Sequence, residues 1–161
     1  MPAPLDAVSP LDGRYADRTA RLRTYASEAA LMRARVRVEA DFLLALARLD
    51  ATPLDLDADT AAAVRDCYEA FDADDAALIK AIETQGYGDY PATNHDVKAV
   101  EYFLRERLPP ATHPWIHFGL TSEDVNNLAY RVLVRDAVEG VLVPPIEALR
   151  STLESMAREY R

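Results

Sequence analysis

The sequence predicts an all-α fold, and three observations support this. Apolar residues recur every three or four positions over long segments, most clearly at Leu31, Val38, Phe42 and Leu46 within residues 25–49. No segment alternates apolar and polar residues for long enough to predict a sheet. Half of the 161 residues are hydrophobic, which is enough for a sizeable core. The expectation is therefore a folded helical protein.

The first half of the chain is expected to form three helices. Ser27 is placed to cap the first helix, which covers residues 25–49. Pro53 and the acid-rich residues 55–59 form a loop, and helices are expected over 60–71 and 74–84. Gly86 is well placed to end the third helix, since glycine readily adopts the left-handed conformation found there.

The second half is expected to add three more helices. One begins near Thr93 or Asn94 and ends before Pro109-Pro110, a second begins at Thr121, and a last one follows an interruption at Pro144-Pro145. The proline-rich residues 109–114 are the best candidate for a domain boundary. We therefore expect an N-terminal helical domain over 1–112, and the first two long helices of an incomplete central bundle over 113–161.

Composition excludes several functional classes. The net charge of −9 argues against binding of nucleic-acid phosphates. A single cysteine excludes an internal disulfide or a cysteine-based zinc site, and three histidines give no indication of a metal. No basic leader precedes an apolar run and no apolar run could cross a bilayer, so a cytoplasmic protein is expected. The scarcity of lysine (Lys80 and Lys98) fits either a salty cytoplasm or a GC-rich genome.

Three polar clusters are candidates for a binding site. In the first, residues 9–15, Arg14 is suited to bind a carboxylate or phosphate, although from the residues alone a tight turn with a solvated arginine is the favoured explanation. In the second, residues 93–98, His95 and Lys98 crowd a helix start whose free N–H groups attract anions. Its alternative explanation is an ordinary helix cap.

The third cluster, residues 119–124, places the hydroxyls of Thr121 and Ser122 at another helix start. Thr121 and Asp124 have the spacing of a capping box, which explains them without a ligand. His113 and His117 flank Trp115, and a structural role is favoured for both because no third metal ligand is evident. Two or three anion-binding helix starts would suit a small polyanionic substrate.

Together these clusters carry a family resemblance. The segments Ser-Pro-Leu-Asp-Gly-Arg-Tyr (9–15), Thr-Asn-His-Asp-Val-Lys-Ala-Val-Glu-Tyr-Phe (93–103) and His-Phe-Gly-Leu-Thr-Ser-Glu-Asp-Val-Asn-Asn (117–127) closely resemble the adenylosuccinate lyase family. This family lies in the fumarase/aspartase superfamily. The three segments occur in the family's order and at about its spacing, over nearly the whole chain.

The resemblance implies an activity and a set of site residues. Members of this family release fumarate by β-elimination from adenylosuccinate, giving AMP, and from succinylaminoimidazole carboxamide ribotide in purine synthesis. They use no metal or organic cofactor and assemble as homotetramers. By resemblance, the substrate-binding residues are Arg14, Tyr15, Asn94, His95 and Asp96, with Thr121 and Ser122 holding the succinyl portion.

The resemblance covers only the front of the family's sequence. The Thr-His-Gly-Gln-Pro segment with the proposed general acid, and the later loop with the base serine, are expected beyond Arg161. Elimination needs both a base and an acid, so residues 1–161 alone are expected to be inactive. The alternative is a stand-alone helical binding or assembly protein derived from the lyase.

Overall fold

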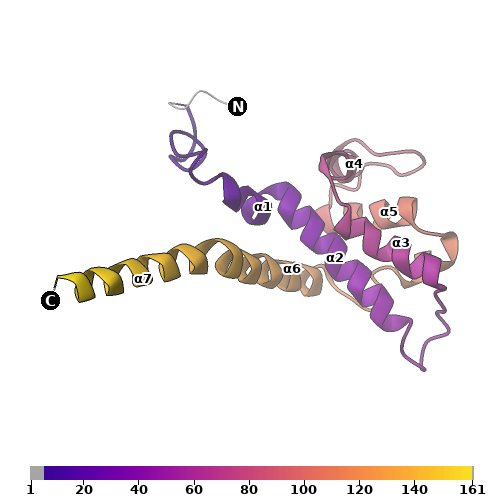
Figure 1. Cartoon of the computed structure of the whole chain (residues 1–161). Helices are drawn as coiled ribbons and strands as arrows, with labels where there is room; N and C mark the ends of the chain where they lie inside the picture. The colour runs from indigo at the N-terminus through magenta and orange to yellow at the C-terminus, as the bar shows by residue number, and fades with distance from the viewer. Residues whose placement is uncertain (1–5, 161) are drawn as a thin grey trace. The chain divides into compact units, whose positions relative to one another are not determined.

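The computed structural model describes residues 6–160, and in that part of the chain the regular structure is helical (Figure 1). The helices, in order, are η1 (Ala20–Leu22), α1 (Arg23–Ala26), α2 (Glu28–Leu46), α3 (Ala58–Glu69), α4 (Ala73–Thr84), α5 (Asp96–Arg107), η2 (Pro110–Trp115), α6 (Ser122–Ala137), η3 (Val138–Leu142) and α7 (Val143–Glu159). An isolated bridge joins Tyr87 to Tyr90, and no strand is named among the described residues. The predicted all-α class is confirmed.

The chain divides into two compact units. The larger unit is Leu31–Val132, and the other combines Met1–Ala30 with Leu133–Arg161. The predicted boundary between an N-terminal domain (1–112) and a central bundle (113–161) is a different kind of division and stays a prediction.

The larger unit is built around one hydrophobic core. Side chains of α2, α3, α4 and α5 meet there, and α4 packs along α5. Phe103 of α5 is fully buried and its ring meets Phe71 edge to face, with centroids 6.1 Å apart. Cys67 also belongs to this core, and burial raises its pKa to about 11, so it is an inert packing residue, as the sequence predicts.

Several helix ends follow the expected local chemistry. Ser27 Oγ accepts from the backbone N–H of Ala30 at 3.1 Å, which confirms it as the cap of α2. Asp72 and Asp75 form a complete capping box at the start of α4. Gly86 follows α4 with φ +88°, the left-handed conformation expected of a helix-ending glycine.

The start of α5 differs from the prediction. The helix begins at Asp96 rather than near Thr93 or Asn94, and His95 is its cap. Asn94 has φ +48° and its N–H donates to Glu83 O at 2.9 Å, so it belongs to the preceding loop. The helix begins later because the backbone N–H groups of Thr93 and Asn94 bond to carbonyls at the end of α4, which holds both residues in the loop.

The predicted interruption at Pro144-Pro145 is wrong. The helix continues from α6 through the π-helical turn η3 into α7, with the prolines in the first turn of α7. Proline lacks an N–H and crowds the carbonyl four residues earlier, and the wider π turn relieves that crowding. Pro144 has no N–H to donate to the Gly140 carbonyl, which instead accepts a hydrogen bond from Arg21 Nη2 at 3.0 Å. The predicted helix over 25–49 is divided at the extended residue Ser27 into α1 and α2, and η1 was not predicted. Both η1 and α1 lie in the same compact unit as this turn.

Among the described residues, no helix combines the length and apolar character needed to cross a bilayer.

Candidate functional site

Two of the three predicted clusters meet in the larger unit, at the starts of α5 and α6. Ser122 Oγ lies 3.5 Å from His95 Nε2, although the two residues are 27 positions apart. Asn94, His95, Asp96 and Thr121 are exposed, and Ser122 is half-buried. The first turns of two helices therefore present N–H groups and hydroxyls on one accessible surface.

His95 is held in a defined orientation. Its Nδ1 accepts from the backbone N–H of Lys98 at 3.3 Å, as a helix cap does. In the neutral ring the proton then resides on Nε2, the nitrogen that faces Ser122 Oγ. Thr93 Oγ1 donates to the His95 carbonyl at 3.0 Å and steadies the backbone here. His95 thus presents a hydrogen-bond donor to this surface.

A buried arginine joins the two helix starts. Arg35 of α2 places Nη2 2.6 Å from Asp96 Oδ2, and its Nε donates to Asn126 Oδ1 at 2.9 Å. Partial burial disfavours the Asp96 carboxylate, but the N–H of Val97 and the Arg35 guanidinium outweigh burial and lower its pKa below 3.8. Asp96 is consequently a fixed anion that faces Arg35.

Thr121 and Asp124 form the predicted capping pair at the start of α6. Asp124 Oδ2 accepts from both the N–H and the hydroxyl of Thr121 at 2.7 Å, and Asp124 N donates to Thr121 Oγ1 at 3.4 Å. These bonds to Thr121 lower the pKa of Asp124 below 3.8. The cap alone accounts for the Thr121 hydroxyl, while Ser122 keeps its hydroxyl for other partners.

We expect Asp124→Asn to destabilise the chain in a pH-dependent manner. A carboxyl whose pKa is lower in the folded state stabilises above its unfolded value, 3.8, and loses that contribution as pH falls through its folded pKa. Urea unfolding between pH 3 and 7 should show the largest difference in free energy of unfolding between wild type and Asp124→Asn near pH 7. The difference should shrink towards pH 3. Asp50→Asn, at an exposed turn, is the control for the loss of one charge. A deficit that stays constant with pH would contradict the assignment.

A second buried charged group lies one turn from Arg35 on the same helix. Glu39 Oε1 lies 2.5 Å from His117 Nδ1, and Glu39 Oε2 is buried without a hydrogen-bond partner. Burial raises the pKa of Glu39 above 4.5, against the opposing effect of His117. On its other side His117 Nε2 lies 3.9 Å from Glu101 Oε1, and Lys98 Nζ binds Glu101 Oε2 at 2.7 Å. His117 is thus part of a polar network between Glu39 and Glu101.

The sequence did not single out Arg35, Glu39 or Glu101. All three are buried, although charged residues on a helix are usually exposed. Residues around the circumference of α2 are buried, so helical periodicity cannot separate its buried charges from its exposed ones. Only the tertiary contacts reveal them.

Arg14 and Tyr15 belong to the smaller compact unit. They lie in an exposed turn region, where the Arg14 guanidinium carbon is 4.8 Å from the centroid of the Tyr15 ring. Their role at the site stays a prediction.

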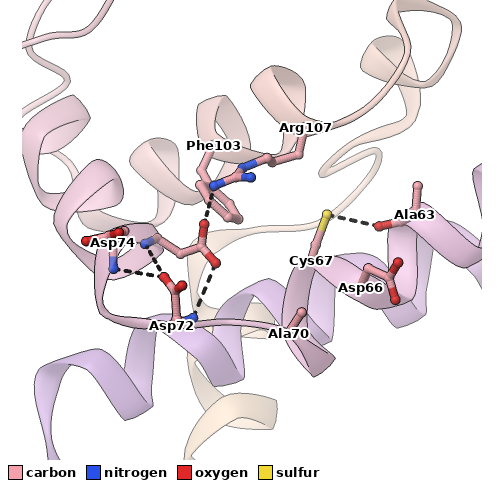
Figure 2. Close-up of a pocket in the computed structure, with 9 residues that line it drawn as sticks. Ala63, Asp66, Cys67, Ala70, Asp72, Asp74, Phe103 and Arg107 are labelled. Atoms are coloured by element: carbon pink, nitrogen blue, oxygen red, sulfur yellow. Dashed lines mark hydrogen bonds and ion pairs between the residues drawn. The ribbon is translucent and has the colours of Figure 1, made fainter.

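A pocket of about 450 Å³ lies elsewhere in the larger unit (Figure 2). Arg107 reaches Asp75 across it, and Cys67 Sγ donates to the Ala63 carbonyl at 3.3 Å. Its lining residues are Ala63, Asp66, Cys67, Ala70, Asp72, Asp74, Asp75, Phe103 and Arg107. Four carboxylates against one guanidinium repel an anion, and none of the predicted site residues takes part. This pocket is therefore unsuited to an anionic ligand.

The paired helix starts can hold a small anion without a metal. The Ser122 hydroxyl and the helix-start N–H groups supply donors, while the Lys98 ammonium is already paired with Glu101 at 2.7 Å. Among residues 6–160 there is no cluster of three or more His, Cys, Asp or Glu side chains suited to a metal ion. Helix starts of this kind favour carboxylate or phosphate groups, and binding of such a group at this surface stays a prediction.

Comparison with known proteins identifies the family of this chain. A family model described as Lyase matches residues 13–161, so the chain belongs to this lyase family. Similar proteins include the adenylosuccinate lyases of Haemophilus influenzae (41% identical), Escherichia coli K12 (39%) and Dictyostelium discoideum (37%). Each alignment covers 98% of this chain and 34% of the relative. The chain therefore spans about a third of the length of these relatives and corresponds to an N-terminal portion of them.

Proposed function

We propose that this chain supplies part of the substrate-binding site of a lyase that releases fumarate from adenylosuccinate and from succinylaminoimidazole carboxamide ribotide. The observation that carries the proposal is the meeting of His95 and Ser122, at 3.5 Å, between two helix starts. A substrate with two carboxylates and a phosphate needs several groups that bind anions, and this surface concentrates them. The identity of the relatives supports the reaction class.

The site residues take distinct roles in this proposal. Thr121 and Ser122 hold the succinyl portion through the N-terminal turn of α6. Asn94, His95 and Asp96 line the binding pocket, and Arg14 and Tyr15 contact the nucleotide side of the substrate. His95 donates a hydrogen bond through Nε2, and Asp96 is too firmly ionised beside Arg35 to act as an acid. No organic cofactor or metal is required by these roles.

The acid and the base of the elimination come from outside residues 1–161. The proton to be removed lies next to a carboxylate and is weakly acidic, so a positioned base is required, and the leaving nitrogen needs an acid. We assign both to the rest of a longer polypeptide. In this proposal residues 1–161 bind substrate without turning it over.

An exposed apolar face on α7 supports assembly with further helices. Its residues are Ile146, Leu149, Leu153, Met156 and Tyr160, each between 49% and 76% exposed. Soluble proteins seldom leave so long a stripe uncovered. We propose that helices of the remaining polypeptide and of a homotetramer cover it. The same face would serve the alternative, a stand-alone helical binding protein with a different partner.

The reading frame beyond Arg161 separates these two functions. A frame that continues into Thr-His-Gly-Gln-Pro, with a product that releases fumarate from adenylosuccinate, supports the lyase. A stop codon directly after Arg161, with no fumarate released by the chain, overturns it and favours the binding protein.

In an active product we expect Ser122→Ala to weaken substrate binding. Loss of a hydrogen bond to a carboxylate is worth about 1.5–3 kcal/mol, so KM should rise about tenfold or more. Ser151→Ala, on the exposed part of α7, is the matched control and should leave KM unchanged. Steady-state release of fumarate measures both variants. Equal KM values for wild type and Ser122→Ala would remove Ser122 from the site.

A further inference from the structure

We infer that Arg35 and Glu39 are positioning residues for this site, because together they tie buried α2 to the two segments that carry the predicted substrate ligands. The inference rests on the proposed function and adds to it two residues that touch no substrate. Both lie on one face of α2, four positions apart.

The first argument is the burial of the two charges. The Arg35 side chain is 7% exposed and the Glu39 side chain is fully buried. Buried ion pairs often stabilise no better than apolar side chains of the same volume, so their presence in a core helix points to a role beyond stability. The contacts of each residue show what that role is.

Arg35 connects the first turn of α5 to Asn126, one turn into α6. Asp96 follows His95 directly, and Asn126 lies one helical turn after Ser122. By binding Asp96 at 2.6 Å and Asn126 at 2.9 Å, one guanidinium fixes the spacing of the two helix starts. The 3.5 Å separation between His95 Nε2 and Ser122 Oγ depends on that spacing.

Glu39 holds the turn that leads into α6. His117 has φ +61°, a left-handed backbone that is strained for a residue with a β-carbon. A turn begins at His117 and is closed by a hydrogen bond from Leu120 N to His117 O at 3.3 Å. This turn ends directly before Thr121, the cap of α6. The 2.5 Å contact between Glu39 and His117 keeps this strained residue in place.

The groups around His117 link the turn back to α5. Glu101 of α5 faces His117 Nε2 at 3.9 Å and binds Lys98 at 2.7 Å. Lys98 supplies the N–H that orients His95. The network therefore runs from α2 through the turn to the first turn of α5, and Glu39 is its most deeply buried member.

The first test uses nuclear magnetic resonance on the 161-residue chain without ligand. Glu39→Gln should shift the His117 imidazole nitrogen signals and the Thr121 and Ser122 amide signals, while His113 serves as an internal reference. Arg35→Lys, which keeps one ionic contact but not the planar fork, should shift the His95 and Ser122 amides. Arg37→Met is the matched control: Arg37 lies 3.5 Å from Asp41 and 5.8 Å from the centre of the Tyr68 ring, and both contacts are away from the two helix starts.

Thermal unfolding by circular dichroism accompanies each spectrum. Folded Glu39→Gln and Arg35→Lys variants whose site signals stay at the wild-type positions would overturn the inference. A purely stabilising role would lower the melting temperature and leave the His117 and Ser122 signals unchanged. If either variant fails to fold, the other decides the question.

The second test separates this inference from the proposed function. In an active complete product, each variant should lower kcat/KM for adenylosuccinate by about tenfold or more, because small displacements of binding groups are costly, while Arg37→Met should not. An inactive wild type would count against the proposed function and leave the resonance result standing. An active wild type matched by both variants would refute the positioning roles alone.

Discussion

Phe103→Ala is expected to lower the free energy of unfolding by about 3–5 kcal/mol, the usual cost of removing a buried phenylalanine. Phe103 is fully buried where α5 meets the other core helices, and its edge-to-face contact with Phe71 disappears with the ring. The Arg107 guanidinium carbon also lies 5.4 Å from the ring centroid. Urea unfolding followed by circular dichroism measures the loss.

The matched control for this substitution is Phe118→Ala. Phe118 is 52% exposed and contacts Trp115 with centroids 5.0 Å apart. Its removal should cost only about 0.5–1.5 kcal/mol, the worth of one aromatic pair. Similar losses for the two variants would show that α5 does not form the centre of the core.

Gly86→Ala is expected to cost about 2–4 kcal/mol, from a left-handed backbone conformation and a forced displacement of the loop. At φ +88°, a β-carbon on Gly86 would stand 2.7 Å from the Tyr90 carbonyl oxygen and 3.0 Å from the Ala92 nitrogen. Both are backbone atoms, and the Tyr87–Tyr90 bridge, with two bonds of 2.9 Å, restrains them. The loop leads directly to Asn94 and His95, so the displacement should also reach the site.

Gly88→Ala provides the comparison in the same loop. Gly88 has φ +55°, but a β-carbon there meets no heavy atom within 4 Å. It should therefore cost only the conformational part, about 1–2 kcal/mol. Urea unfolding gives both values, and the amide resonances of residues 93–96 report the displacement. Equal costs for Gly86→Ala and Gly88→Ala would contradict the close approach.

The acidic pocket of Figure 2 illustrates why a cavity alone does not identify a binding site. Its volume of about 450 Å³ would accommodate a small ligand, yet its lining carries four aspartates. The paired helix starts form a more open surface, but they present donors to an anion. For the proposed substrate, which carries carboxylates and a phosphate, the four aspartates make this pocket unfavourable.

The sequence by itself determined the helical class, the helix-ending role of Gly86, the cap at Ser27 and the pairing of Thr121 with Asp124. These features depend on residues within a few positions of one another, so local propensity and hydrogen bonding suffice to predict them. It also supplied the three polar clusters and the family to which the chain belongs.

Only the tertiary structure decided how those local features combine. The continuous helix through Pro144-Pro145 depends on a π turn whose Gly140 carbonyl is satisfied by Arg21, 119 residues away. The meeting of His95 with Ser122, and the buried Arg35 and Glu39 that link their segments to α2, depend on contacts between distant segments. Residue periodicity describes one helix at a time, so a charge buried by its neighbours looks the same in sequence as a charge in water.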